Sequence, residues 1–151
     1  LQPADVQDLS DFLKALGLDV PVFPMGVGSN LIVRDGGLRG AVILTHGAFS
    51  KLEPRADGLI WCEAGVPCAR IARHCVRLGL GPAEFFAGIP GTLGGALAMN
   101  AGAFGGETWS HVREVEVIDR SGNIRWRAAG EYRFDYEPLR DSLRRCRAGG
   151  G

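Results

Sequence analysis

Residues 85–107 read FFAGIPGTLGGALAMNAGAFGGE, and seven of these residues are glycine. Glycine adopts positive φ and lets a ligand approach the main chain where a Cβ would collide. The run Gly-Ile-Pro-Gly-Thr-Leu-Gly-Gly leading into Ala-Leu-Ala-Met predicts a turn that opens a short helix. A helix start presents unpaired N–H groups, which suit a phosphate. The alternative interpretation is a loop that only packs between two elements.

A second glycine loop lies earlier in the chain. Residues 24–34 read PMGVGSNLIVR, with apolar runs at 20–23 and 31–33 on either side of the glycines. This pattern predicts strand, turn and strand, and the N–H groups of such a turn can converge on an anion. Neither the dinucleotide fingerprint Gly-x-Gly-x-x-Gly nor the Gly-Lys-Ser/Thr of a phosphate loop is completed. Together the two loops predict one diphosphate-containing cofactor held between two lobes.

Composition bounds the class of protein. The chain has 151 residues, is 46% hydrophobic, and carries 17 basic and 17 acidic residues. This content is ample for a folded core, and the zero net charge does not indicate a nucleic-acid partner. No stretch is apolar enough to span a membrane, and no secretory signal is recognisable, although the chain begins at Leu1. We expect a cytoplasmic protein.

The four cysteines and three histidines show no metal-ligand spacing, so no metal site is expected. Cys68 and Cys75 are seven apart and are expected to pack as small apolar residues on one helix face. Arg70, Arg73 and Arg77 share a helix face, which is either a phosphate-binding surface or, as is far commoner, a solvated one.

Periodicity predicts a first lobe over residues 1–46 and a second over 47–136. The first lobe has an amphipathic helix from Asp5, the N-cap, to Leu16, and later strands. The second has a strand, a helix and a C-terminal hairpin. The predicted strands are 20–23, 30–33, 40–45, 59–64, 112–119 and 124–127, and the second helix is 66–78. Residues 137–151 form an irregular tail.

Two long motifs resemble those of a known enzyme family. GVGSNLIVRDGGLRGAVI (26–43) and EFFAGIPGTLGGALAMNAGAFGGE (84–107) are similar to UDP-N-acetylenolpyruvoylglucosamine reductases, over about residues 1–135. The resemblance implies the α+β, two-lobed FAD-binding fold of the vanillyl-alcohol-oxidase (PCMH) type. It also implies an enzyme in which non-covalent FAD is reduced by NADPH and reduces a UDP-sugar enolpyruvyl substrate, in peptidoglycan precursor synthesis. Covalent flavin is not expected, because the first loop carries Ser29-Asn30 where some relatives of this fold carry histidine.

The resemblance also assigns the cofactor site. It implies that both glycine loops cradle the pyrophosphate and that the segment after the short helix lies near the isoalloxazine ring. The residues so assigned are Gly26, Val27, Gly28, Ser29, Asn30 and Leu31 in the first loop, Gly88, Ile89, Pro90, Gly91, Gly94 and Gly95 in the second, and Asn100, Gly102 and Ala103 near the ring. Phe104 and Trp109 either stack on the cofactor or cover an edge of the core.

The catalytic motif departs from the family pattern. After Phe134-Asp135-Tyr136 the family would place arginine, but Glu137 stands there, and Arg140-Asp141-Ser142 follows. Either three residues are inserted and Arg140 is the catalytic arginine, or the match is accidental. We expect a segment before Leu1 and the substrate domain to be missing, so that this chain alone is inactive. The alternatives are a non-catalytic FAD-binding or nucleotide-binding remnant, or another FAD-linked oxidase of the same fold.

Overall fold

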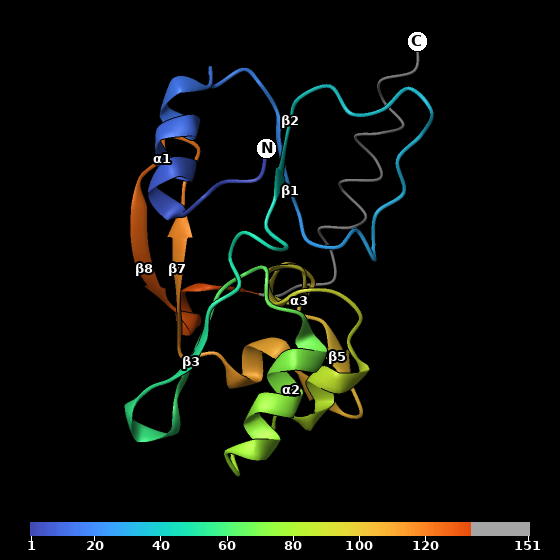
Figure 1. Cartoon of the computed structure of the whole chain (residues 1–151), viewed down its shortest axis with the longest axis vertical. Helices are drawn as coiled ribbons and strands as arrows, with labels where there is room; N and C mark the ends of the chain where they lie inside the picture. The colour runs from blue at the N-terminus through green and yellow to red at the C-terminus, as the bar shows by residue number, and fades with distance from the viewer. Residues whose placement is uncertain (134–151) are drawn as a thin grey trace.

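The computed structural model describes residues 1–133. The candidate catalytic Arg140, Cys146 and the predicted tail therefore lie outside the described residues. Figure 1 shows two groups of elements, one built around α1, β1 and β2, and the other around α2, α3 and β5. The helices are α1 (Val6–Ala15), α2 (Cys68–Arg77) and α3 (Leu93–Met99). The strands are β1 (Val22–Met25), β2 (Ala41–Leu44), β3 (Leu52–Pro54), β4 (Ile60–Cys62), β5 (Gly102–Ala103), β6 (Gly106–Glu107), β7 (Glu114–Ile118) and β8 (Ile124–Ala128). The short 3-10 helices are η1 (Ala56–Gly58), η2 (Glu84–Gly88), η3 (Thr108–His111) and η4 (Ala129–Glu131).

The first helix forms where the sequence predicts it. The Asp5 carboxylate accepts a hydrogen bond from the Asp8 N–H at 2.8 Å, which caps the helix start. Leu9 and Leu13, four apart, are buried on one face. These two side chains and Ile43 of β2 form the smaller core, and Val22, Phe49 and Ile118 are among the residues that pack against it.

Strands β1 and β2 pair in parallel, with Val22 opposite Ala41. Residues 26–40 join them as a long irregular connection, and this connection contains the first glycine loop. The predicted strand at 30–33 is therefore wrong. Among residues 1–133 no strand pairs with this run, and Ile32 is 96% exposed there. An apolar run becomes a strand only where another strand offers hydrogen bonds.

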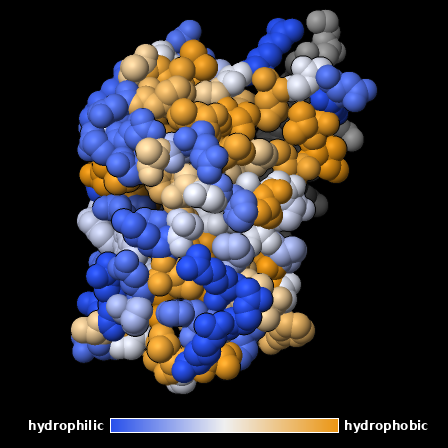
Figure 2. Space-filling view, in the orientation of Figure 1, coloured by the Kyte–Doolittle hydropathy of each residue, from blue (hydrophilic) through white to orange (hydrophobic). Residues whose placement is uncertain are grey.

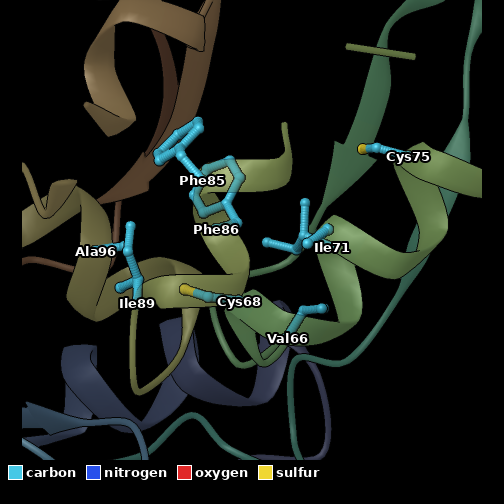
Figure 3. Close-up of a cluster of buried hydrophobic side chains, with 9 residues drawn as sticks. Val66, Cys68, Ile71, Cys75, Phe85, Phe86, Ile89 and Ala96 are labelled. Carbon is cyan, nitrogen blue, oxygen red and sulfur yellow. The ribbon is translucent and has the colours of Figure 1, made fainter. Parts of the chain in front are cut away.

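The second helix carries the larger core, drawn in Figure 3. Cys68, Ile71, Ala72 and Cys75 recur at helical spacing and are buried on the face that meets η2. The prediction that Cys68 and Cys75 pack as small apolar residues is confirmed, because both are buried free thiols. The members of the larger core are Val66, Cys68, Ile71, Ala72, Cys75, Phe85, Phe86, Ile89 and Ala96.

The predicted C-terminal hairpin is confirmed as β7 and β8, which pair antiparallel. Its turn reaches back to the first helix: the Ser10 hydroxyl donates to the Gly122 carbonyl at 2.7 Å. Arg120 donates to the carbonyls of Gly17 and Val20 at 3.0 and 2.9 Å. The boundary between residues 46 and 47 remains a prediction, but this hairpin from the second predicted lobe helps to build the first core (Figure 1).

Apolar side chains gather over the upper part of the face shown in Figure 2, where β1, β2 and the connection after β1 lie. The connection contributes the exposed residues Val27, Leu31, Ile32, Val33 and Leu38. Within residues 1–133, no helix has the length and apolarity that a bilayer crossing requires.

Candidate functional site

The two glycine loops lie against each other. The first comprises residues 26–31 after β1, and the second comprises residues 88–95 from the end of η2 into α3. The Ser29 hydroxyl donates to the Pro90 carbonyl at 3.3 Å, across 61 positions of sequence. A Cβ built on Gly91 would lie 2.8 Å from that hydroxyl oxygen, and one on Gly26 would collide with the Thr92 hydroxyl. The two loops that the sequence assigned to one cofactor are therefore in contact, and the cofactor between them stays a prediction.

The first loop offers a row of main-chain donors. Among residues 1–133, the amides of residues 26–30 have no hydrogen-bond acceptor, and the next amide, Leu31, donates to the Gly28 carbonyl at 3.2 Å. Gly28 has φ 76°, in the left-handed region that glycine adopts without steric cost. A run of unpaired amides on a turn is suited to an anion such as a pyrophosphate.

In the second loop, some main-chain N–H groups already donate to neighbouring carbonyls of the protein. In the first turn of α3, the Leu93 amide donates to the Val66 carbonyl at 2.9 Å and the Gly94 amide to the Ala64 carbonyl at 2.8 Å. The unpaired helix start expected from the sequence is thus only partly present. Within the described chain, the amides of Gly91 and Gly95 have no acceptor.

The glycines of the second loop have different surroundings. A Cβ on Gly94 would lie 3.1 Å from both the Cβ and the carbonyl oxygen of Ala64, so this glycine permits close packing of the helix. A Cβ on Gly95 would meet no atom within 4 Å. Gly95 therefore has open space beside its free amide.

The residues predicted near the ring hold a small hairpin in place. Asn100 ends α3 with φ 43° and ψ 47°, and its amide group donates to Glu107 at 3.2 Å while its oxygen accepts from the Trp109 N–H at 3.2 Å. Gly102 lies in β5, where a Cβ would approach the Gly106 carbonyl oxygen to 2.6 Å. Ala103 lies against Gly88, so this hairpin borders the second loop.

The thiols behind the site are kept protonated by burial. Burial raises the pKa of Cys62 to about 12, with smaller contributions from Cys68 and Cys75, and raises that of Cys68 to about 11. Burial also raises the pKa of Cys75. A protonated thiol is a poor nucleophile, so the three residues fill the core rather than react.

Other polar candidates do not join the loops. Arg70, Arg73 and Arg77 are exposed along α2, and Arg70 donates to the Ser50 carbonyl at 3.0 Å. A hollow of about 350 Å³ lies between α2 and η2, and its lining includes Arg73 and Glu84 but no residue of either loop. Among residues 1–133, no cluster of histidine, cysteine and carboxylate side chains could hold a metal ion.

Sequence reasoning did not single out Thr92 or Ala64. Thr92 is buried and faces Gly26, and Ala64 receives the Gly94 amide. Thr92 follows the GIPG run directly, and this position was its only signal in the sequence. Nothing in the local pattern around Ala64 indicates its contact with α3, because that contact is tertiary.

Comparison with known proteins identifies the family. The FAD binding domain model matches residues 1–127. The UDP-N-acetylenolpyruvoylglucosamine reductase of Alkalilimnicola ehrlichii is 58% identical over 135 residues, which are 89% of this chain and 45% of the relative. The Methylococcus capsulatus protein of the same name is 54% identical, covering 89% of this chain and 44% of the relative.

A solved structure agrees with these matches. The crystal structure of UDP-N-acetylenolpyruvylglucosamine reductase from Thermus caldophilus superposes with a TM-score of 0.73 at 31% identity, covering 89% of this chain and 47% of that chain. The chain thus spans about half the length of the relatives it matches. The predicted α+β FAD-binding fold is confirmed. The chain belongs to the FAD binding domain family, as the FAD-binding portion found in UDP-N-acetylenolpyruvoylglucosamine reductases.

Proposed function

We propose that this chain binds FAD non-covalently between its two glycine loops and serves an NADPH-dependent reductase of peptidoglycan precursor synthesis. The reaction would convert UDP-N-acetylglucosamine enolpyruvate to UDP-N-acetylmuramate in the cytoplasm. The names of the relatives support this activity. The observation that carries the proposal is the row of amides at residues 26–30 without acceptors in the described chain, on a loop in contact with a second loop that has free amides at Gly91 and Gly95.

The residues of the cradle fit a pyrophosphate. Amides without acceptors in the described chain can donate to its oxygens, and the positive φ of Gly28 and Gly91 (76° and 113°) turns the main chain there without a side chain in the way. The Ser29 hydroxyl, which donates to the Pro90 carbonyl, shows that the two loops lie side by side. When bound, FAD would accept a hydride from NADPH and deliver it to the enolpyruvyl double bond. The protein's part here is binding and orientation.

The remaining steps need groups beyond the described residues. Reduction of an enolpyruvyl ether requires stabilisation of a developing enolate and a proton donor. Arg140 stays the proposed residue for the first task, and a substrate-binding part of the complete enzyme would hold the UDP-sugar. Preference for NADPH over NADH is part of the same proposal.

FAD titration with charge variants at Gly95 tests the cradle. Gly28 and Gly91 are poor sites for substitution, since their positive φ would strain any other residue. Gly95 has open space, and an aspartate in the first turn of a helix does not destabilise it. We expect Gly95→Asp to weaken FAD binding by about tenfold or more, because a carboxylate would face the pyrophosphate. Gly95→Asn, which is neutral and of the same size, should weaken it less.

Gly130→Asp is the matched control, because Gly130 also has no atom within 4 Å of a built Cβ and lies in η4. It should bind FAD as the parent does. If the parent does not quench FAD fluorescence, the proposed cofactor role is wrong. If Gly95→Asp binds as tightly as the parent, FAD does not lie in this cradle. Anaerobic bleaching of bound FAD by NADPH and by NADH then tests the reductant.

A further inference from the structure

Arg120, in the turn between β7 and β8, bonds to the segment that follows the first helix. Its nitrogen Nη2 donates to both the Gly17 and the Val20 carbonyls, at 3.0 and 2.9 Å. These carbonyls lie just after the C-terminal end of α1, where the helix dipole favours a cation. The other terminal nitrogen, Nη1, is buried and has no acceptor within residues 1–133. The guanidinium is therefore enclosed where the turn meets the first core, and hydrogen bonds from a charged donor are the stronger kind.

A second bond and a close approach fix the same turn to α1. The Ser10 hydroxyl, 1% exposed as a residue, donates to the Gly122 carbonyl at 2.7 Å across 112 positions of sequence. A Cβ built on Gly122 would lie 2.6 Å from the Ser10 carbonyl oxygen, so the two main chains lie against each other. The turn itself is held by Asp119, whose carboxylate accepts from the Asn123 N–H at 3.0 Å. We refer to the Arg120 and Ser10 hydrogen bonds together as the turn contact.

The other end of the hairpin is fixed to the helix that carries the second glycine loop. The Trp109 indole N–H donates to the Leu97 carbonyl of α3 at 2.8 Å, and the Thr108 hydroxyl donates to the Ala101 carbonyl at 2.7 Å. Both residues belong to η3, which precedes β7 in the chain. Strand β7 has five residues and so extends on the order of 14 Å from η3 to the turn (Figure 1). A continuous series of bonded elements thus joins the second loop to the turn contact.

The acceptors of Arg120 lead to the first glycine loop. Gly17 and Val20 lie between α1 and β1, and β1 ends at Met25, directly before Gly26. Between the loops themselves, the Ser29–Pro90 hydrogen bond is exposed and 3.3 Å long. An exposed hydrogen bond competes with water and contributes little. The relative placement of the two loops therefore depends on the turn contact as well as on the contacts at the loops.

We propose that Arg120 is a positioning residue, which sets the placement of the two glycine loops for FAD by bonding the β7–β8 turn to the segment between α1 and β1. The inference rests on the proposed function, because it assumes that FAD is held by both loops. Loops that are held in place before the cofactor arrives lose less entropy when they bind it. Loss of the turn contact should therefore weaken FAD binding although Arg120 does not touch the loops.

Three variants of the whole chain test the role of the turn contact. Arg120→Met keeps a long side chain and removes both hydrogen bonds, and we expect its Kd for FAD to rise about fivefold or more. Ser10→Ala removes the other bond from the α1 side, and its Kd should rise about threefold. Arg120→Lys should stay within about twofold of the parent, because both native bonds come from one nitrogen and a lysine ammonium has three donors.

Arg127→Met is the matched control in the same hairpin. The Arg127 Nε donates to Glu131 at 3.1 Å and its guanidinium lies over the Tyr132 ring, away from the turn. Its Kd for FAD should stay within about twofold of the parent. All titrations follow FAD fluorescence at a temperature well below the Tm of each variant, so that a change in the folded fraction does not enter the measured Kd.

Amide NMR without FAD separates positioning from a purely local structural role. In Arg120→Met, the N–H signals of residues 26–30 and of Gly91 should shift relative to the parent, and in Arg120→Lys they should return toward parental positions. If Arg120 serves only the local fold, the shifts will be confined to the turn and to residues 10–22, and the inference is wrong. Parental FAD affinity in both Arg120→Met and Ser10→Ala would also overturn it.

The remaining outcomes are equally decisive. FAD binding by Arg127→Met as weak as that by Arg120→Met would show a general effect of destabilisation and contradict the inference. FAD binding by Arg120→Lys as weak as that by Arg120→Met would show that the two hydrogen bonds are not the cause. If Arg120→Met does not fold, Ser10→Ala decides the question. Failure of the parent to bind FAD would contradict the proposed function, whereas the NMR comparison without FAD still tests the placement of the loops.

Discussion

The two glycine loops use the same residue type for different purposes. In the first loop the amides of residues 26–30 have no acceptor within the described chain, and Gly28 alone requires a positive φ. In the second loop, Leu93 and Gly94 donate to carbonyls of a neighbouring segment, and Gly94 packs 3.1 Å from Ala64. The first loop is therefore a row of donors, and the second is mainly a packed support with free donors at Gly91 and Gly95.

The difference shows that a glycine-rich sequence does not distinguish a ligand-binding loop from a packing loop. Glycine permits both close packing and ligand approach, and the two uses look the same in one sequence. The two uses can be told apart only when the atoms around the Cβ position of each glycine are known. Substitutions at adjacent glycines should therefore have opposite consequences, and the following predictions exploit this.

The largest expected effect comes from Gly94→Val, compared with Gly95→Val. At Gly94 the new side chain would meet the Ala64 main chain and Cβ, both 3.1 Å from its first carbon. We expect the free energy of unfolding to fall by about 1–3 kcal/mol, the usual result of overpacking. Gly95→Val meets no atom, so its free energy of unfolding should stay within about 0.5 kcal/mol of the parent. Urea unfolding measures both, and equal losses would refute the distinction between these glycines.

A double-mutant cycle tests the contact between the loops. A Cβ on Gly26 would lie 3.2 Å from the Thr92 Cγ2 and closer still to its hydroxyl oxygen. We expect Gly26→Ala to lower the free energy of unfolding by about 1–2 kcal/mol, and to cost about 1 kcal/mol less in a Thr92→Ala background. Additive effects in urea unfolding would mean that the loops do not touch at this point.

Alkaline pH should lower the free energy of unfolding through the thiols of Cys62 and Cys68. A thiol of the unfolded chain ionises near pH 9.0, whereas Cys62 and Cys68 in the folded chain ionise near about 12 and 11. Between these values the unfolded state binds fewer protons, so stability must fall as the pH rises above 9. Urea unfolding from pH 8 to 10.5 should show this decline, and Cys62→Ala should make it shallower. An identical decline in Cys62→Ala would exclude this thiol as a cause.

The smallest effect is expected from Ser29→Ala. The hydroxyl is exposed and donates one 3.3 Å hydrogen bond to Pro90, so the free energy of unfolding should change by less than about 0.5 kcal/mol. Thermal unfolding checks this, with Ser121→Ala as a surface control, since the bond that Ser121 makes to Asp119 within the described residues comes from its main-chain N–H. A loss of several kcal/mol would mean that this hydrogen bond, rather than the Gly26–Thr92 contact, joins the loops.

Much of the fold could be predicted where the signal is local. The cap at Asp5 with the spacing of Leu9 and Leu13, and the alternation of β7 and β8, depend on neighbours a few residues away. The run Leu31-Ile32-Val33 has the same composition as a strand but lies in the open connection. Composition could not reveal this, because a strand is defined by its partner.

The candidate site, too, could be predicted only in part. The sequence indicated that the two loops serve one cofactor, and the contacts of Ser29 and Gly26 show that the loops lie close enough together to do so. It could not predict that Leu93 and Gly94 donate to Val66 and Ala64, because these bonds depend on where the segment before α2 passes. The assignment of single residues to FAD remains a prediction.

Amide NMR of the whole chain during FAD addition tests the central claim most directly. If the first loop is the row of donors and the second the support, the N–H signals of residues 26–30, Gly91 and Gly95 should shift together in one saturable transition. Those of Leu93 and Gly94 should keep their existing hydrogen bonds and move little. Shifts confined to one loop, or gathered elsewhere, would contradict a cofactor held between the two.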